Sequence, residues 1–332
     1  MLITTKAYAR AGLVGNPSDG YFGKTISFIV RNFAAEITLY ESPQLTIEPN
    51  QRDHSVFGSI GALASDVRQN GYYGGIRLLK ASVKRFFDHC TKEGLDLHGR
   101  NFTLRYQSDI PPQVGMAGSS AIITACWRAL MQFYNIDIPN HILPGLVLSV
   151  ENDELCIPAG LQDRVIQAYE GVVFMDFNRA SIEKLGYGIY EELDPALLPP
   201  VYVAYTTRLS EGTEVFHNDI RSRWNRGERD IVSAMYQWAN LAQRVRDMLT
   251  DGRGHDIGPL LNENFDLRRR LYNLSAGNIA MVEAARDCGA SAKFTGSGGA
   301  IVGTYEDEAM FQRLQAALEP MSVAVIKPRI LP

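Results

Sequence analysis

The 332-residue sequence has the composition of a globular protein, with 45% apolar and 21% charged residues. Its formal net charge of −4 gives no basic surface of the kind that binds nucleic acid or an anionic membrane. The N-terminus lacks the pattern of a signal peptide, and no apolar run is long enough to span a bilayer. We therefore expect a cytoplasmic protein without nucleic-acid or membrane partners, whose oligomeric state the sequence does not predict. The four cysteines lie too far apart in the sequence for the close spacing that is typical of a zinc site or a disulfide framework. They are Cys90, Cys126, Cys156 and Cys288.

The first half of the chain predicts strands and helices in alternation. Runs of β-branched and aromatic residues indicate strands, and apolar residues at helical spacing indicate helices. The predicted elements are strands at 7–14, 25–32 and 34–40, a helix at 74–90, a strand at 101–107, helices at 121–133 and 141–155, and a strand at 171–177. Between the first two strands, Gly15–Gly20 is too rich in turn-forming residues for regular structure.

The second half of the chain is more helical. The predicted elements are a strand at 201–206, helices at 230–249, 259–274 and 278–287, and a strand at 323–327. The first of these helices carries one apolar stripe, which is typical of a helix that packs on a core. Gly289 is expected to end the third helix in a left-handed conformation. A boundary between residues 178 and 200 divides the chain into two predicted domains, 1–185 and 186–332.

One segment between a predicted strand and a predicted helix has the features of an anion-binding loop. It reads Pro-Pro-Gln-Val-Gly-Met-Ala-Gly-Ser-Ser-Ala over Pro111–Ala121. Such a loop presents backbone N–H groups and the positive end of a helix dipole to a phosphate. It lacks the Lys of a Walker motif and the glycine spacing of a dinucleotide-binding fold. Taken alone, an ordinary helix start capped by serine is the alternative.

Three further segments contain residues suited to phosphate or sugar chemistry. Thr295–Gly299 is a second glycine-rich loop. A strand that runs into a polar turn carries Arg10 and Asp19, and a predicted turn at Pro158–Asp163 carries Asp163. Each has a plain structural explanation when taken singly, because glycine and aspartate are common in turns and arginine is common on surfaces.

Together, and in this order, the four segments resemble the GHMP kinases, the family of galactokinase, homoserine kinase, mevalonate kinase and phosphomevalonate kinase. The resemblance covers the whole chain. It includes the N-terminal strand and turn, the Pro-x-x-x-Gly-x-x-Ser-Ser loop with one extra position, and the C-terminal Thr-Gly-Ser-Gly-Gly loop. Within the family, the chain is most similar to members that phosphorylate glucuronic acid at the anomeric carbon. This closer likeness lies in Gly15–Gly23, Gly71–Leu79, Ala159–Val165, Asn264–Arg269 and Lys293–Ala300.

The resemblance implies an α/β (α+β) protein with the two-domain GHMP kinase fold. Residues 1–185 would form an N-terminal, ribosomal-protein-S5-domain-2-like domain that carries the phosphate-binding loop. Residues 186–332 would form a smaller, ferredoxin-like C-terminal domain. The active site is expected between the two domains, where clefts commonly form.

The resemblance also implies roles for individual residues in an ATP-dependent phosphoryl transfer. Asp163 matches the catalytic aspartate that accepts or orients the proton of the sugar hydroxyl, and Arg10 matches the cation that stabilises this aspartate and the developing charge. Ser120 and Glu151 match the ligands of the Mg²⁺ that accompanies ATP. The ATP phosphates would bind Gly115, Met116, Ala117, Gly118, Ser119, Ser120, Gly296, Ser297 and Gly298, and the sugar would bind Asp19, Asn16 and Gly23.

The same resemblance favours D-glucuronate as the substrate, with glucuronate 1-phosphate and ADP as products. A kinase for another sugar, such as fucose, arabinose, galacturonate or a heptose phosphate, is the nearest alternative. A non-catalytic sensor of sugar and ATP is another. Galactose is disfavoured because Asn16-Pro17 replaces the Glu-His usual in galactokinases. A uronic acid also needs a cation for its carboxylate. The candidates are Lys24, Arg31, Arg164, Arg221 and Arg223.

Overall fold

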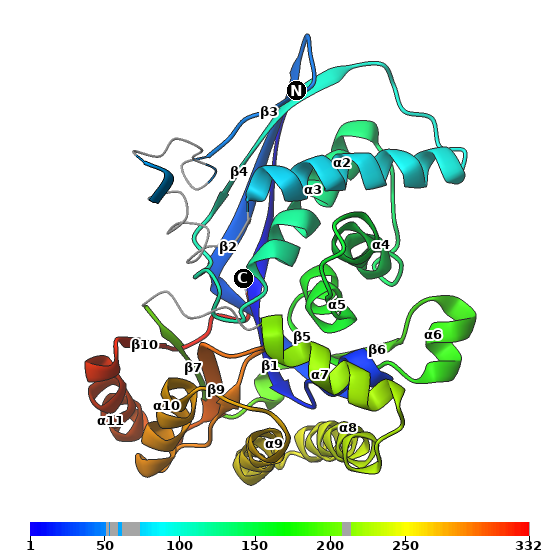
Figure 1. Cartoon of the computed structure of the whole chain (residues 1–332). Coiled ribbons are helices and arrows are strands. Elements are labelled where there is room, and N and C mark those ends of the chain that lie inside the picture. Colours follow the sequence, from blue (N-terminus) through cyan, green and yellow to red (C-terminus); the bar gives the residue numbers. More distant parts are fainter. Residues whose placement is uncertain (51–52, 54–58, 62–73, 208–213, 332) are drawn as a thin grey trace. The chain divides into compact units, whose positions relative to one another are not determined.

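The computed structural model describes residues 1–50, 53, 59–61, 74–207 and 214–331 (Figure 1). The chain forms two compact units that interleave along the sequence. The first unit comprises Met1–Ala9, Phe33–Ile110 and Ala117–Ala168, and the second comprises Arg10–Asn32, Pro111–Met116 and Tyr169–Pro332. The predicted division into 1–185 and 186–332 stays a prediction. The segment Gly71–Leu79, which carries part of the family resemblance, begins with three residues that lie outside the described ones.

Two long strands, β1 (Leu2–Val14) and β2 (Lys24–Ser42), pair with each other, and each contributes residues to both units. In the first unit, β4 (Asn101–Ser108) pairs antiparallel with residues 35–42 of β2, and β3 (Thr46–Ile47) pairs parallel with β4. The helices of this unit are α2 (Gly75–Lys92), α3 (Gly118–Tyr134), α4 (Leu143–Ser149), a π-helical turn at Val150–Glu154, and α5 (Leu161–Tyr169).

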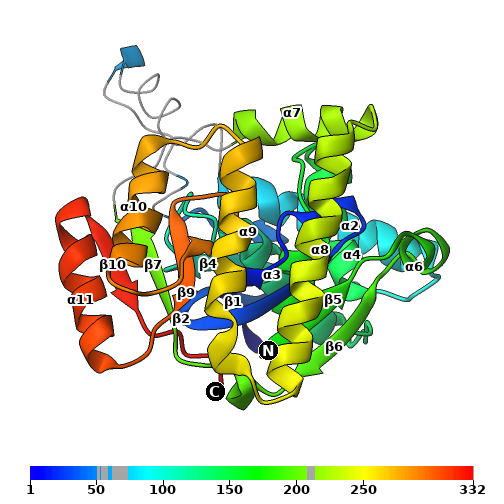
Figure 2. The same ribbon diagram turned by 90° about the horizontal axis from the view of Figure 1, so that it is seen from below.

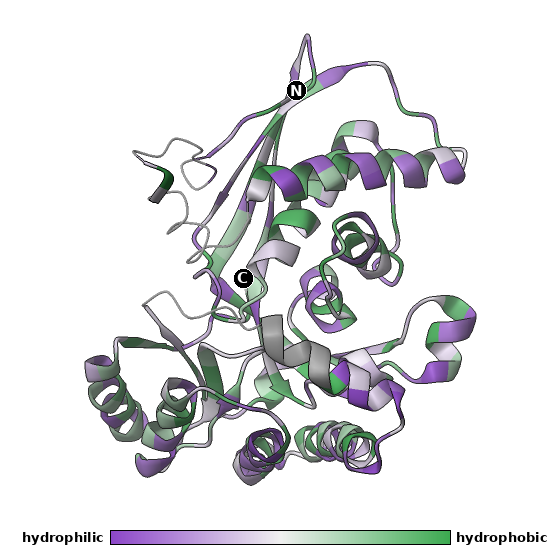
Figure 3. Cartoon of the chain, viewed as in Figure 1, coloured by the Kyte–Doolittle hydropathy of each residue, from purple (hydrophilic) through white to green (hydrophobic). Residues whose placement is uncertain are grey.

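Aromatic residues fill the core of the first unit. The rings of Phe86 and Trp127 meet edge to face at 5.4 Å, and those of Phe102 and Phe133 at 5.2 Å. All four side chains are almost completely buried. Such pairs add to the burial of apolar area, which is the main stabilising term. Figure 3 shows α2 banded in hydrophobic and hydrophilic colours, as expected of a helix that buries one face.

The second unit contains strands of two sheets. Residues 24–28 of β2 pair with β5 (Val172–Asp176), which pairs with β6 (Ile189–Leu193), and α6 (Arg179–Leu185) connects these two strands. A short 3-10 helix at Ser18–Tyr21 lies between β1 and β2. We call the whole connection, Gly15–Gly23, the N-terminal turn.

The second sheet is antiparallel, with the strand order β10-β7-β9-β8. Its strands are β7 (Val201–Thr206), β8 (Lys293–Phe294), β9 (Ala300–Thr304) and β10 (Val323–Ile326). The helices of the second unit that follow β7 in the chain are α7 (Glu214–Asn225), α8 (Arg229–Thr250), α9 (Gly258–Leu271), α10 (Ala276–Asp287) and α11 (Glu308–Leu318). In chain order the sheet reads 4-1-3-2, which confirms the predicted ferredoxin-like sheet. Figure 2 shows α8 and α9 side by side.

The structure confirms most predicted elements and corrects several. The strands predicted at 25–32 and 34–40 form one continuous strand, β2. Helices α6, α7 and α11 and strand β6 were not predicted. The turn predicted to carry Asp163 is wrong, because this residue lies in the first turn of α5. Gly289 has the expected left-handed conformation after α10, with φ 92°. In the described part of the chain, no helix is both long enough and apolar enough to span a membrane.

One glycine of the second sheet is required by its packing. A Cβ on Gly303 in β9 would lie 1.6 Å from the carbonyl oxygen of Ser291 and 2.9 Å from the ring of Tyr202. We expect Gly303→Ala to lower the free energy of unfolding by about 3 kcal/mol, because backbone must move to admit the methyl group. Urea denaturation measures this change. The matched control is Gly277→Ala, where the Cβ meets nothing within 4 Å in α10. An equal loss in both variants would contradict the packing explanation.

Candidate active site

Helix α3 of the first unit begins at a constrained residue, Ala117. Its backbone is left-handed, with φ 63°. The Ala117 carbonyl accepts hydrogen bonds from the Ala121 N–H at 3.2 Å and the Ser120 hydroxyl at 3.1 Å. The side-chain amide of Gln167 donates to the same carbonyl at 3.0 Å. The first N–H groups of a helix lack partners within it, so Gly118–Ser120 can donate to an anion, as the sequence predicts.

The predicted metal ligand Glu151 lies on the π-helical turn of the first unit and is 2% exposed. One carboxylate oxygen accepts a hydrogen bond from the Ser119 hydroxyl at 2.9 Å. The other oxygen is paired with the buried guanidinium of Arg164. Ser120, which the family resemblance assigned to the metal, is 1% exposed and donates to its own helix. The serine hydroxyl beside Glu151 is thus that of Ser119.

Asp163 lies next to this ion pair, in the first turn of α5. Its side chain is 21% exposed, whereas the Arg164 side chain is 3% exposed. The Arg164 guanidinium is 3.5 Å from the Asp163 carboxylate and also donates to the carbonyl of Gly160 at 2.9 Å. One cation therefore contacts two carboxylates of the first unit. Arg164 was predicted instead as one of the candidate cations for the carboxylate of a uronate.

In the second unit, Arg10 connects the three segments that resemble family signatures. Its guanidinium donates to the carbonyls of Gly115 at 2.6 Å and Thr295 at 3.2 Å. Its backbone N–H donates to Met116 at 3.2 Å, and the Gly12 N–H donates to Thr295 at 2.9 Å. Arg10 is 5% exposed. The end of β1, the start of the phosphate-loop segment and the C-terminal glycine loop thus meet around one side chain.

The two glycine loops approach each other too closely for side chains. A Cβ on Gly296 would lie 2.5 Å from the Gly115 carbonyl oxygen. A Cβ on Gly115, which has φ 67°, would lie 3.0 Å from the Ser297 nitrogen and the Gly298 oxygen. Glycine at these positions permits the backbone contact and the left-handed conformation.

Helix α9 supplies two functional candidates that sequence analysis did not assign. The Arg268 guanidinium donates to the carbonyls of Gly296 at 2.8 Å and Ser297 at 3.3 Å. The Asn264 side chain accepts from the Gly15 N–H at 2.7 Å. Both residues are buried, at positions of α9 where helical periodicity calls for apolar residues. Polar residues inside an apolar stripe were the signal that could have identified them.

A buried lysine, Lys293, forms hydrogen bonds with the end of β1 and with the N-terminal turn. The Lys293 ammonium donates to the Gly12 carbonyl at 2.6 Å and to the side-chain oxygen of Asn16. Burial lowers the pKa of Lys293 well below its usual value, and the cations Arg268 and Arg10 lower it further. Asn16 is 3% exposed, so its side-chain oxygen belongs to the scaffold of the turn. The signal for Lys293 was its place two residues before the glycine loop at Thr295–Gly299.

The predicted sugar residues Asp19 and Gly23 also lie in the N-terminal turn. A Cβ on Gly23 would lie 2.3 Å from the Ser18 hydroxyl, so this glycine lets the turn close on itself. The Ser18 hydroxyl donates to the Lys24 carbonyl at 3.0 Å. Asp19 lies in the first turn of the short helix and acts electrostatically on Tyr21. Asp19 is the acidic residue of Gly15–Gly23, and its role in sugar binding stays a prediction.

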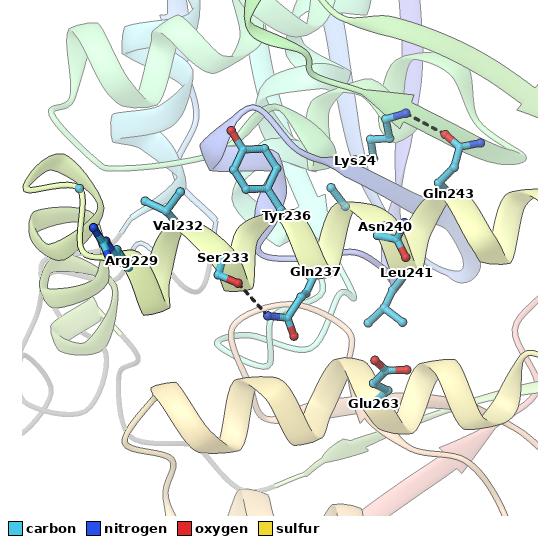
Figure 4. Close-up of a pocket in the computed structure, with 12 residues that line it drawn as sticks. Lys24, Arg229, Val232, Ser233, Tyr236, Gln237, Asn240, Leu241, Gln243 and Glu263 are labelled. Carbon is cyan, nitrogen blue, oxygen red and sulfur yellow. Dashed lines mark hydrogen bonds between the residues drawn. The ribbon is translucent and has the colours of Figure 1, made fainter.

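A pocket of about 860 Å³ in the second unit lies along α8 (Figure 4). Its lining includes Tyr236, Gln237 and Glu263, but none of the residues with predicted roles in phosphate binding or catalysis. Figure 4 shows the Lys24 amine directed at Gln243, to whose side-chain oxygen it donates at 2.7 Å. Because its lining lacks these residues, we do not place the candidate active site in this pocket.

Comparisons with known proteins support the assignment made from the sequence. A family model described as the GHMP kinases N terminal domain matches residues 77–171. The Arabidopsis thaliana protein named Probable glucuronokinase 2 is 46% identical over 304 residues, which cover 90% of this chain and 82% of that protein. Glucuronokinase 1 of the same organism is 44% identical over 306 residues, which cover 90% of this chain and 84% of that protein.

The fold also has solved counterparts. The crystal structure of Lactococcus lactis galactokinase complexed with galactose superposes with a TM-score of 0.76 over 99% of this chain and 93% of that chain, at 15% identity. At this identity the likeness establishes the fold alone. The family predicted from the signature segments is confirmed by the sequence relatives, which match at more than 40% identity over nine tenths of the chain. The chain belongs to the GHMP kinase family.

Proposed function

We propose that the chain transfers the γ-phosphoryl group of ATP to the anomeric hydroxyl of D-glucuronate, giving glucuronate 1-phosphate and ADP. The observation that carries the proposal is the 44–46% identity, over 90% of the chain, to two proteins named as glucuronokinases. The reaction uses ATP and a free sugar acid as substrates, and we propose that it occurs in the cytoplasm. The candidate residues for such a transfer are divided between the two units.

In the first unit, the start of α3 would bind phosphate oxygens and Asp163 would act on the acceptor. The backbone N–H groups of Gly118, Ser119 and Ser120 are suited to the ATP phosphates, because they are held at a helix N-terminus. Asp163 would accept or orient the proton of the anomeric hydroxyl as its oxygen attacks phosphorus. The Arg164 guanidinium lies 3.5 Å from the Asp163 carboxylate and would help to hold it in position.

In the second unit, Arg10 would act by position and by charge. It holds the carbonyls of Gly115 and Thr295, so that the backbone N–H groups of both glycine loops keep their directions. Its positive charge would stabilise the charge that develops on the transferred group. Asp19 would accept hydrogen bonds from sugar hydroxyls, while Asn16 and Gly23 shape the turn that carries it.

The residues around Glu151 fit a magnesium ion. Mg²⁺ prefers hard oxygen ligands and is commonly held by one or two carboxylates together with phosphates and water. We propose Glu151 and Ser120 as ligands. To bind the ion, the Ser120 hydroxyl would give up its bond to the Ala117 carbonyl, and Glu151 would share its oxygens with Ser119 and Arg164. When bound, the ion would neutralise charge on the ATP phosphates. The buried Arg164 compensates the charge of Glu151 in the protein itself.

A sugar panel tests the proposed substrate. ADP release by the full chain with Mg²⁺-ATP is followed for D-glucuronate, D-galacturonate, L-fucose, L-arabinose and D-glucose. We expect kcat/KM for D-glucuronate to exceed that for the neutral sugars by about 100-fold or more, because a site built for a polar group rejects analogues that lack it. Chelation of Mg²⁺ should abolish turnover. Faster turnover of a neutral sugar would contradict the proposed substrate, and binding without turnover would favour the sensor alternative.

The role of Asp163 is tested by Asp163→Asn, which keeps the shape of the side chain and removes its charge. We expect kcat to fall by about 1,000-fold, the usual scale for a lost proton acceptor. The KM for ATP should change by less than about threefold, because phosphate binding does not use this group. The matched control is Asp153→Asn, whose 64% exposed side chain pairs with Arg85 at 3.6 Å. Full activity of the Asp163→Asn enzyme would refute the assignment.

A further inference from the structure

Four of the five cationic side chains suggested for a uronate carboxylate already have a carboxylate partner. Lys24 lies 3.3 Å from Asp176. Arg31 pairs with Glu170, and Arg164 pairs with Glu151. Arg223 pairs with Glu228 at 2.6 Å and also with Asp230. A cation that is neutralised within the protein has less to gain from a substrate carboxylate.

Arg221 is the exception among these five. Within the part of the chain that the structure describes, Arg221 forms no ion pair with a carboxylate. One guanidinium nitrogen donates to the Gly20 carbonyl at 2.8 Å, and the guanidinium carbon lies 4.2 Å from the centre of the Tyr21 ring. The side chain is exposed. A guanidinium has five N–H donors, so one bond to a carbonyl leaves an edge for bidentate pairing.

The contacts of Arg221 place it on the N-terminal turn, beside the proposed sugar residue Asp19. Its own helix, α7, is attached to this turn by a second contact, in which Trp224 meets Tyr21 edge to face at 5.2 Å. A Cβ on Gly20 would lie 3.0 Å from a guanidinium nitrogen of Arg221, so glycine allows this close approach. The guanidinium is therefore positioned by a ring and a carbonyl, both adjacent to Asp19 in sequence.

Charged side chains act on the tyrosines of and beside the N-terminal turn. Burial raises the pKa of Tyr21, Asp19 adds to this effect, and Arg221 and Arg268 oppose it. The same three charged groups act on Tyr272. Arg221 and Arg268 are thus two guanidinium groups close enough to this turn to act on its tyrosines. A sugar acid offers Arg221 a carboxylate to pair with, whereas a neutral sugar does not.

We infer that Arg221 is the specificity residue that binds the carboxylate of the uronic acid. The inference rests on the proposed function, since it assumes a uronate substrate. The carboxylate lies on C5 of the sugar ring, away from the reacting anomeric oxygen. Its pairing with Arg221 would therefore contribute equally to the bound substrate and to the transition state, and its loss should appear in KM.

The test compares Arg221→Gln and Arg221→Lys with the unaltered enzyme in assays that vary D-glucuronate and ATP separately. Arg221→Gln should raise KM for D-glucuronate by about 10- to 100-fold, the scale of a charge-assisted bidentate pair. Its kcat should stay within about threefold, and KM for ATP should not change. Arg221→Lys should give an intermediate KM, since it keeps the charge and loses the paired donors.

Arg229→Gln is the matched control, because it removes the same charge from an exposed position at the start of α8. It should leave both KM values unchanged. An unchanged KM for D-glucuronate in Arg221→Gln would overturn the inference. A fall in kcat comparable to the rise in KM would also overturn it, because such a fall indicates that the substitution distorts the turn. Failure of the unaltered enzyme to phosphorylate D-glucuronate would instead overturn the proposed function, so the two failures are distinguishable.

Discussion

The hydrogen bonds of the Arg10 guanidinium are the constraint on which the second unit's candidate site depends. Its contacts with Gly115 and Thr295 span 105 and 285 positions of sequence. Without the guanidinium, and counting the described residues, the Gly115 carbonyl would keep only the Thr295 hydroxyl as a donor, and the Thr295 carbonyl would keep only the Gly12 N–H. The glycines at 115 and 296 follow from the same constraint, since the loops that Arg10 joins have no space for a Cβ. We propose that the same guanidinium also stabilises the charge that develops on the transferred phosphoryl group.

In the first unit, a second buried arginine, Arg164, contacts the candidate residues and holds them in place. Arg164 is buried between Glu151 and Asp163, and it leaves each carboxylate with a different surrounding. Glu151 is 2% exposed and hydrogen-bonded to Ser119, which suits a fixed ligand. The Asp163 side chain is 21% exposed, which suits a group that must meet a substrate. Differences in environment allow two carboxylates to take different roles.

Local features of the site could be predicted from the sequence, and long-range contacts could not. The loop at Gly115–Ser120 is recognisable because glycine and serine at a helix start have a direct physical effect on anions. The contact of Lys293 with Asn16 spans 277 positions, and no local pattern indicates it. The sequence did not distinguish the five candidate cations, and for Lys24 and Arg31 the partners, Asp176 and Glu170, are distant in the chain. Helix α6 has no buried residue and is bounded by the Asn178 cap and the left-handed Gly186, so no apolar period indicated it in the sequence.

The site of phosphorylation on the sugar tests the central claim most directly. The full chain is incubated with D-glucuronate, ATP and Mg²⁺, and the product is examined by phosphorus–proton correlation NMR. The new phosphorus signal should correlate with the anomeric proton and grow in step with ADP. A signal that correlates with another sugar proton, or release of inorganic phosphate with the sugar unchanged, would contradict transfer to the anomeric oxygen.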